Sequence, residues 1–97
     1  MFTSKQRSNL RSLAQNITPL GQVGKGGISE NMINSFSEAL EARELIKISV
    51  LNNTDESARD IAIELAEQLN AEVVEVIGKK IVLYRKSSRK GFDHVKF

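Results

Sequence analysis

Three glycines and a lysine stand together in the segment Gly24-Lys25-Gly26-Gly27, shortly before Ser29, a residue type that begins helices well. Glycine lets backbone N–H groups approach a ligand without obstruction by a Cβ atom. The N-terminus of the helix behind the loop would add free N–H donors at the positive end of the helix dipole. Lys25 adds a mobile cation at the same point. These residue types, in this order, are suited to binding a phosphate group.

The spacing of the glycines separates this loop from other phosphate sites. Gly24 and Gly27 make a Gly-x-x-Gly loop, the device with which KH domains clamp a nucleic-acid backbone. A Walker A loop is excluded, because the four-residue gap and the Ser or Thr after the lysine are missing. The Gly-x-Gly-x-x-Gly pattern of dinucleotide sites is absent as well. The alternative interpretation is a glycine turn that only reverses the chain.

Side chains suited to catalysis are scarce. The single histidine, His94, lies in the segment 87–97, which has no hydrophobic periodicity, and this argues against a histidine general base. Most acids are spaced as on the solvent face of a helix rather than as a converging pair. Because the chain has no cysteine, it has no disulfide, thiolate zinc site or cysteine nucleophile. We therefore expect a protein that is not an enzyme, with no catalytic residues, no metal site and no cofactor.

Capping residues and apolar spacing predict the elements that precede the loop. Thr3 or Ser4 can cap a first helix over about residues 4–16. Gln6 stands three residues after Thr3, as in a capping box. Residues 20–23 leave room only for a short strand before the glycines.

The elements after the loop alternate between helix and strand. The spacing of apolar residues predicts a second helix over about residues 30–42, and β-branched residues predict a strand over about 45–51. A further strand covers the valines of residues 73–77. Gly78 and Lys79 then form a two-residue hairpin turn with glycine first, as a type II′ turn prefers, before a last strand over residues 80–85.

A third helix lies between these strands and has the clearest amphipathic pattern in the chain. Its apolar positions run from Ala58 to Leu69, with Thr54 or Asp55 as the predicted N-cap and Asn70 as a left-handed C-cap. Its outward residues are acidic, namely Asp55, Glu56, Asp60, Glu64 and Glu67. This face is either a solubilising surface or a module that docks a basic partner such as a ribosomal protein.

The predicted order is α-β-α-β-α-β-β, a single compact α/β domain with three helices and a small four-stranded mixed sheet. The strand, helix and strand around residues 30–42 form a β-α-β unit, so these two strands should be parallel with a right-handed crossover. The continuous apolar run 81–84 suits a central strand that is covered on both faces. We assign residues 1–86 to the domain and residues 87–97 to a basic, mobile C-terminal tail.

Charge is segregated along the chain, although the net charge is only +2. Residues 1–25 carry four cations and no acid, and residues 77–97 carry seven cations against one acid. Residues 26–76 hold eleven acids against three cations. If the fold brings the two ends together, the protein has one positive face, as a polyanion binder requires. The alternative is that the basic ends are separate solvated surfaces.

Cations near the chain start are not explained by helix stability. Lys5 and Arg7 fall in the first turn of the predicted first helix, where positive charge opposes the helix dipole. Arg7 and Arg11 lie one turn apart on the same face, so they could form a guanidinium pair for phosphates. Otherwise they are ordinary solvated arginines.

The chain shows no apolar run long enough for a membrane span and no apolar segment of a secretory signal behind its first charges. We expect a cytoplasmic monomer without a membrane partner. Because only five residues are aromatic, base stacking can carry little of the affinity for a nucleic acid. Phosphate and shape recognition should dominate, which predicts a structured, largely base-paired RNA and strong salt sensitivity.

Several segments of the chain form a linked set. They are Thr3-Ser4-Lys5-Gln6 with Leu10-Arg11, Pro19, Val23-Gly24-Lys25-Gly26-Gly27-Ile28-Ser29, Arg43-Glu44-Leu45-Ile46-Lys47-Ile48, and Val76-Ile77-Gly78-Lys79-Lys80-Ile81-Val82-Leu83-Tyr84-Arg85. In order and spacing this set resembles the chloroplast RNA splicing and ribosome maturation (CRM) domain, over about residues 3–86. The chain is most similar to the stand-alone bacterial form, the YhbY-like proteins.

The resemblance implies an RNA-binding fold similar to the C-terminal domain of translation initiation factor three. It also implies a non-enzymatic protein that associates with ribosomal RNA in large-subunit (50S) precursors and assists ribosome assembly. Carried over by residue, the family's RNA-contacting loop falls on Gly24, Lys25, Gly26 and Gly27. The implied basic surface consists of Lys5, Arg7, Arg11, Lys79, Lys80 and Arg85.

Overall fold

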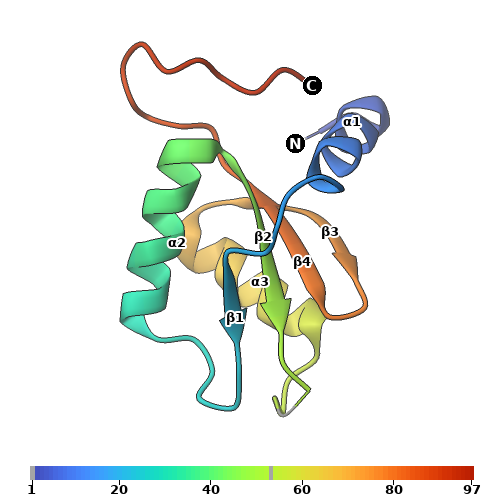
Figure 1. Ribbon diagram of the computed structural model, residues 1–97, viewed down its shortest axis with the longest axis vertical. Helices are drawn as coiled ribbons and strands as arrows, with labels where there is room; N and C mark the ends of the chain where they lie inside the picture. The colour runs from blue at the N-terminus through green and yellow to red at the C-terminus, as the bar shows by residue number, and fades with distance from the viewer. Residues whose placement is uncertain (1, 53) are drawn as a thin grey trace.

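The order of elements in the computed structural model, which describes residues 2–52 and 54–97, is the predicted α-β-α-β-α-β-β (Figure 1). The first and last residues of each element lie within two residues of the predicted ones, where these were given. The largest of these differences is in α1, which ends at Ala14 instead of residue 16. The elements are α1 (Ser4–Ala14), β1 (Gly21–Val23), α2 (Glu30–Arg43), β2 (Leu45–Val50), α3 (Ala58–Leu69), β3 (Glu72–Ile77) and β4 (Lys80–Tyr84).

The four strands form one mixed sheet in the order β1-β2-β4-β3. β1 pairs with β2 in parallel, which confirms the predicted β-α-β unit, and the remaining pairs are antiparallel. β4 lies between β2 and β3, as its continuous apolar run predicts. Gly78 has φ +55° in the hairpin that joins β3 to β4, a value that glycine adopts without strain. A register shift between Val73 and Glu75 marks a bulge in β3.

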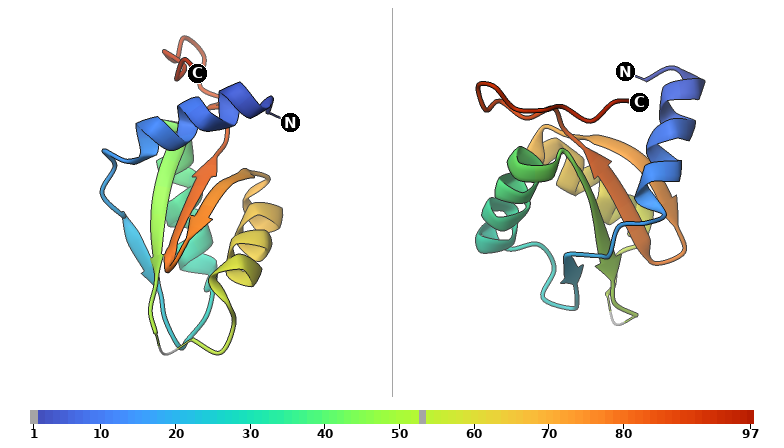
Figure 2. Two further views of the ribbon diagram at one scale, coloured as in Figure 1. Left: turned by 90° about the vertical axis from the view of Figure 1, so that its right-hand side faces the viewer. Right: turned by 45° about the horizontal axis from the view of Figure 1, so that its top comes forward.

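The helices divide between the two faces of the sheet (Figure 2). α2 and α3 cover one face and bury the larger core cluster, in which Ile46, Ile48, Ile81 and Leu83 are fully buried. α1 crosses the other face, where its buried Leu10 packs in a second core cluster. The rest of that face is left uncovered by helices.

The second core cluster is smaller and joins α1 to β2, β3 and β4. It contains Leu10, Ala14, Leu45, Val74, Val82 and Tyr84. Alternation along the strands explains both clusters, because successive side chains of a strand point to opposite faces. In β2, for example, Leu45 belongs to the second cluster and Ile46 to the first.

Side-chain caps fix where the helices begin. Thr3 and Gln6 form the predicted capping box at α1, and Ser29 caps α2 by accepting the Met32 N–H at 3.1 Å. The predicted N-cap of α3 is wrong. Ser57 caps this helix by accepting the Asp60 N–H, whereas the Thr54 hydroxyl donates to backbone carbonyls in the preceding turn.

The start of α3 differs from the prediction, whereas its end agrees with it. Asp55 and Glu56 precede the helix instead of lying on its outward face, which leaves Asp60, Glu64 and Glu67 exposed there. At its other end, Asn70 has φ 55° and ψ 43°, which confirms the predicted left-handed C-cap.

The C-terminal segment, residues 87–97, runs past the end of α2 toward α1 (Figure 1). It contains no helix or strand, and residues near both of its ends contact the domain. Ser87 is buried, and its N–H donates to the carboxylate of Glu44 at 2.6 Å. At the far end, the Phe97 ring packs edge-on against Tyr84 and Phe2, with ring centroids 5.0 and 5.5 Å away. These contacts join positions far apart in sequence, which local periodicity does not reveal.

Candidate nucleic-acid interface

The glycine loop connects β1 to α2 at one end of the long axis of the molecule (Figure 1). It is closed by a hydrogen bond of 2.9 Å from the Gly27 N–H to the Gly24 carbonyl. Gly27 has φ +74°, so a side chain there would strain the backbone. A Cβ at Gly26 or at Gly27 would meet no atom within 4 Å, but only Gly27 has a positive φ. The space beside Gly26 is therefore open to a ligand.

Free donors and a free cation remain at this loop. The N–H groups of Lys25 and Gly26 make no hydrogen bond to any of residues 2–52 and 54–97, and both residues are exposed. Behind the loop, Glu30 already places a negative charge in the first turn of α2. The attraction of a phosphate to this loop therefore depends on Lys25 and the loop N–H groups more than on the helix dipole.

The hairpin turn between β3 and β4 lies at the same end of the sheet. The N–H of Val50, at the end of β2, donates to the Lys79 carbonyl at 2.7 Å, and the next N–H, of Leu51, donates to Val23 at 2.9 Å. The end of β2 thus joins the glycine loop to the hairpin. Two exposed lysines predicted as site residues, Lys25 and Lys79, flank this end.

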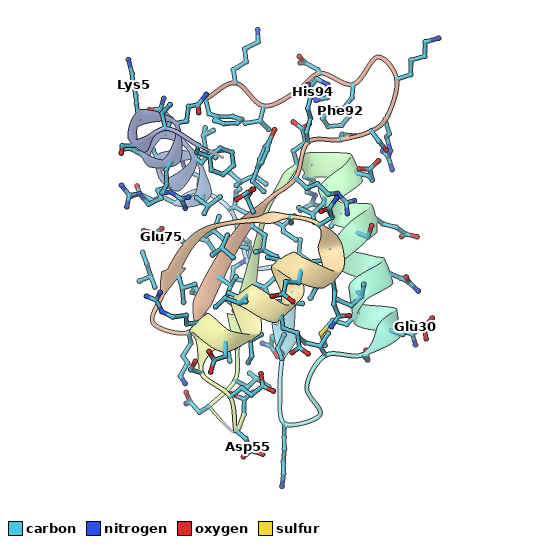
Figure 3. All side chains as sticks on the ribbon, turned by 180° about the vertical axis from the view of Figure 1, so that it is seen from behind. Lys5, Glu30, Asp55, Glu75, Phe92 and His94 are labelled. Carbon is cyan, nitrogen blue, oxygen red and sulfur yellow. The ribbon has the colours of Figure 1, made fainter. Side chains whose placement is uncertain are left out.

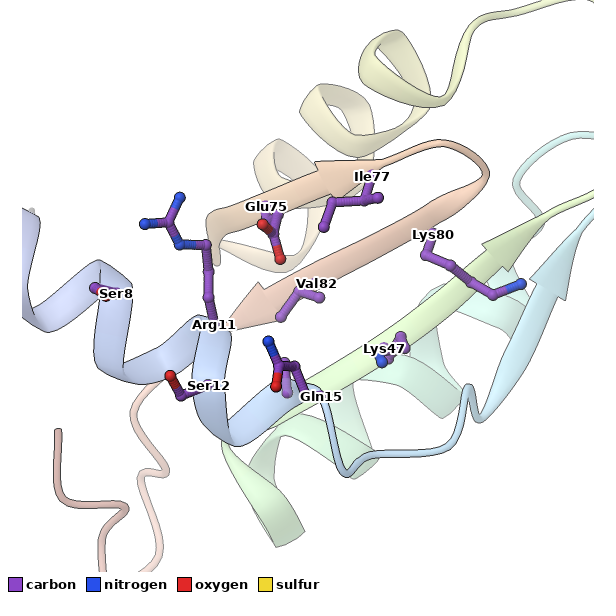
Figure 4. Close-up of a pocket in the computed structure, with 10 residues that line it drawn as sticks. Ser8, Arg11, Ser12, Gln15, Lys47, Glu75, Ile77, Lys80 and Val82 are labelled. Carbon is purple, nitrogen blue, oxygen red and sulfur yellow. The ribbon is translucent and has the colours of Figure 1, made fainter.

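A groove of about 350 Å³ lies between α1 and the uncovered part of the sheet (Figure 4). Strand register explains its lining. Lys47 of β2 pairs with Val82 of β4, which pairs in turn with Glu75 of β3, so these side chains cross one face in a row. The next row contains Lys80. Arg11 faces this groove from α1, together with Ser8, Ser12 and Gln15.

Comparison with known proteins places the chain in a family. The model of the CRS1 / YhbY (CRM) domain matches residues 2–85. The chain belongs to the CRM domain family. It is 52% identical over 87 residues to the Probable RNA-binding protein YqeI of Bacillus subtilis (strain 168), across 90% of this chain and 91% of the relative.

Two further relatives agree with this membership. An RNA-binding protein of Haemophilus influenzae is 32% identical over 86 residues, across 89% of this chain and 87% of the relative. The solution structure of SAV1595 from Staphylococcus aureus superposes with a TM-score of 0.77 at 50% identity, and covers 93% of this chain and 94% of that one. The fold of this CRM domain therefore also appears in a solved relative.

Two predicted site residues of this CRM domain point their guanidinium groups into the protein. Nη1 of Arg7 donates to the carbonyls of Val73 and Val74 in β3, at 2.7 and 2.9 Å, and the group lies 5.6 Å from the centre of the Phe2 ring. The predicted guanidinium pair is thus not present, because Arg11 lines the groove while Arg7 holds β3. Both orientations were equally compatible with the helical spacing of these residues.

Arg85 lies on the other face of the sheet, between α2 and α3. Its guanidinium donates to the carbonyls of Leu69 and Ser37, at 2.8 and 2.9 Å, and forms an ion pair of 3.3 Å with Glu41. The hydrogen bond from the Ser88 hydroxyl is the main reason that the pKa of Glu41 is lowered, and Arg85 adds to that effect. The donors of Arg85 therefore join elements of the CRM domain to one another.

The basic residues predicted as one surface are in fact separated. Lys5 is exposed at the start of α1, at the same end of the molecule as His94 and at the opposite end from Asp55 (Figure 3). The structure brings together the glycine loop with Lys79 at one end, and Arg11 with Lys80 at the groove. Within residues 2–52 and 54–97, ion pairs are formed only by Arg85 and His94.

Sequence reasoning missed Lys47, which lines the groove of this CRM domain. The sequence pattern that points to Lys47 is the alternation in β2. Lys47 and Ser49 interrupt the apolar residues at every second position, and so they mark the uncovered face of the sheet. Across the described residues we find no cluster of three or more side chains suited to holding a metal ion. No helix in that part of the chain is both long and apolar enough to cross a bilayer.

Proposed function

We propose that this protein binds structured ribosomal RNA in precursors of the large (50S) ribosomal subunit and assists ribosome assembly without catalysing a reaction. One observation carries the proposal. Five cations line the groove or flank the glycine-loop end, and none of them has a carboxylate partner among residues 2–52 and 54–97. These cations are Arg11, Lys25, Lys47, Lys79 and Lys80. Such free cations are suited to phosphate groups, which dominate nucleic-acid affinity.

Phosphate contacts fit this surface better than base stacking. Phe2, Tyr84 and Phe97 pack against one another, and Phe36 is buried in the core. Phe92 lies beside His94 in the C-terminal segment, away from the groove. The surface that carries the free cations therefore presents no aromatic platform among the described residues, so affinity should depend strongly on salt.

Family membership and the names of the relatives support RNA as the partner. Proteins of Bacillus subtilis and Haemophilus influenzae that match nearly the whole chain in sequence are named RNA-binding proteins. The association with 50S precursors, a cytoplasmic location and a monomeric state are parts of our proposal. They rest on the family resemblance and on the charge distribution of the domain.

Sucrose-gradient sedimentation of the tagged protein from a bacterial lysate tests the proposal. Fractions are collected at low and at high salt, and the RNA that co-purifies is sequenced. We expect the protein to migrate with large-subunit precursors at low salt and to return to the top of the gradient at high salt. A protein that stays at the top at low salt, without RNA, would contradict the proposal.

A second candidate function is the docking of a basic protein partner by α3. One observation favours it, because Ile63 is 49% exposed on α3 between the exposed acids Asp60, Glu64 and Glu67. Reversing the charges of Glu64 and Glu67 should then abolish recruitment of a basic ribosomal protein while RNA binding persists. An unchanged set of bound proteins would leave α3 as a solubilising surface.

A further inference from the structure

The groove between α1 and the sheet contains one residue that phosphate binding does not explain. Glu75 is half-buried in the same row as Lys47, with Val82 between them, and it forms no ion pair with any of residues 2–52 and 54–97 (Figure 4). A carboxylate repels phosphate, so its presence among Arg11, Lys47 and Lys80 opposes simple backbone binding. An ionised carboxylate is a hydrogen-bond acceptor only. A ligand that contacts Glu75 in the groove must therefore offer a donor.

The floor of the groove is also unusual for a phosphate site. Ile77 lines the groove and is 61% exposed, the largest exposure among the exposed large apolar side chains of the described residues. Val82 lies beside it and is buried. Ile77 therefore offers an apolar surface next to Glu75. A planar ligand that has an apolar face and a donor-bearing edge fits this combination.

We propose that the groove holds one unpaired nucleotide of the bound RNA, with guanine as the preferred base. This inference rests on the proposed function. The face of the base lies on Ile77, and Glu75 accepts hydrogen bonds from the base edge. Arg11, Lys47 and Lys80 bind the phosphates on either side. Apolar side chains and edge hydrogen bonds are how proteins commonly read a base that has left its stack.

Base chemistry sets the order of preference. Guanine presents a ring N–H and an amino group side by side, which can donate together to the two oxygens of one carboxylate. Adenine and cytosine present an amino group without a neighbouring ring N–H, and uracil has no amino group. Gln15 lines the same groove and offers a donor and an acceptor, which suits the carbonyl of guanine as well as other bases. Glu75 is therefore the residue that should set the preference.

The test compares RNA hairpins that differ at a single position. One hairpin is fully paired, and four others carry a one-nucleotide bulge of G, A, C or U. Fluorescence anisotropy at fixed low salt gives the Kd of each hairpin for the wild-type protein and for Glu75→Gln. Glu72→Gln is the matched control, because Glu72 is an exposed glutamate of the same strand that does not line the groove.

Glu75→Gln should change the affinity for the G-bulge hairpin and for the fully paired hairpin in different ways. Wild-type protein should bind the G bulge about tenfold more tightly than the fully paired hairpin, with U the weakest bulge. Glu75→Gln should lose most of that preference, yet bind the fully paired hairpin at least as tightly, because a negative charge has been removed. Ile77→Ala should reduce the preference without changing the dependence of affinity on salt. Glu72→Gln should keep the wild-type preference.

Other outcomes would overturn the inference. If Glu75→Gln strengthens binding to all five hairpins by the same factor, Glu75 only opposes the phosphates and reads no base. Equal affinity of wild-type protein for bulged and fully paired hairpins would have the same meaning. If none of the RNAs binds at low salt, the proposed function itself fails, which is a result distinct from binding without base preference.

Discussion

The side chain of Glu44 accepts a hydrogen bond of 2.7 Å from the backbone N–H of Val95, which lies 51 residues further along the chain. The same carboxylate accepts the Ser87 N–H at 2.6 Å and contacts Nδ1 of His94 at 2.5 Å. Glu44 is fully buried and has φ +65° at the C-terminal end of α2. One side chain thus holds both ends of the C-terminal segment to the domain.

Glu44→Gln should loosen the C-terminal segment. The substitution keeps the size of the side chain but removes the charge that strengthens its three contacts, so we expect a loss of about 1–3 kcal/mol in the free energy of unfolding. Urea denaturation measures this loss, and limited trypsin digestion should cut at Arg89 or Lys90 faster than in the wild type. Glu38→Gln, on an exposed position of α2, is the control. Equal stability and equal cleavage rates would show that the segment is held by other contacts.

Acid should weaken the fold through the same residue. Burial raises the pKa of Glu44, but the hydrogen bonds from Ser87, Val95 and His94 outweigh it, so the pKa lies below its ordinary value of 4.5. Since the folded state has the lower pKa, this contribution to stability is present above pH 4.5 and is lost as the pH falls through the lowered value. Denaturation curves from pH 7 to pH 3 should therefore show a smaller loss for Glu44→Gln than for the wild type. Parallel losses in both proteins would contradict this assignment.

Arg85 should act on stability rather than on direct contact with RNA. Its guanidinium donates to carbonyls of both α2 and α3, and lysine cannot reproduce this fork of donors. Both Arg85→Lys and Arg85→Ala should reduce the free energy of unfolding, the alanine variant by about 2 kcal/mol or more. Chemical denaturation gives these values, and RNA affinity is measured where each variant is folded. A fully stable Arg85→Ala that binds RNA weakly would instead place Arg85 in the interface.

Lys25→Glu should weaken RNA binding and leave the fold intact. Lys25 is exposed in the glycine loop, so the substitution puts a repelling charge beside the free N–H groups while no buried contact changes. We expect about tenfold weaker binding at low salt with an unchanged melting temperature. Lys90→Glu makes the same charge change in the C-terminal segment, at the opposite end of the molecule, and should have a much smaller effect. Equal affinities of Lys25→Glu and wild-type protein would remove the loop from the mechanism.

Lys47 and Lys80 should each account for one phosphate contact. Replacing either by alanine should lower affinity for all RNAs alike and reduce the slope of log K against log salt by about 1. Anisotropy titrations at several salt concentrations measure this slope. Lys86→Ala, at an exposed position outside the groove, is the control. An unchanged slope for both groove variants would indicate that RNA binds elsewhere.

Local signals in the sequence were sufficient to predict the fold. The caps at Thr3, Ser29 and Asn70, the glycine of the hairpin and the apolar run of β4 all act within a few residues of their partners. The N-cap of α3 was misplaced because several capping residue types stand close together there. Thr54 is occupied by the turn, which leaves Ser57 to cap the helix.

The candidate site was less predictable, because the charge of a side chain does not show in which direction that side chain points. Arg7 and Arg11 share a helical face, yet the bulge of β3 brings carbonyls within reach of Arg7 alone. Arg85 follows a strand whose alternation turns it toward α2 and α3, where it meets the carbonyl of Leu69 at the end of α3 and that of Ser37 within α2. Such partners lie far away in sequence. The alternation that identified the strands would also have identified Lys47, had it been applied to the polar positions.

The contact of Arg7 with β3 also bears on how the protein behaves at high concentration. A sheet that ends in an unprotected strand can template the addition of strands from other molecules, which leads to aggregation. Here β3 is interrupted by a bulge, and Arg7 already occupies the carbonyls of Val73 and Val74. At the opposite side, β1 is only three residues long. Neither margin of the sheet offers a long, regular template for the addition of a further strand.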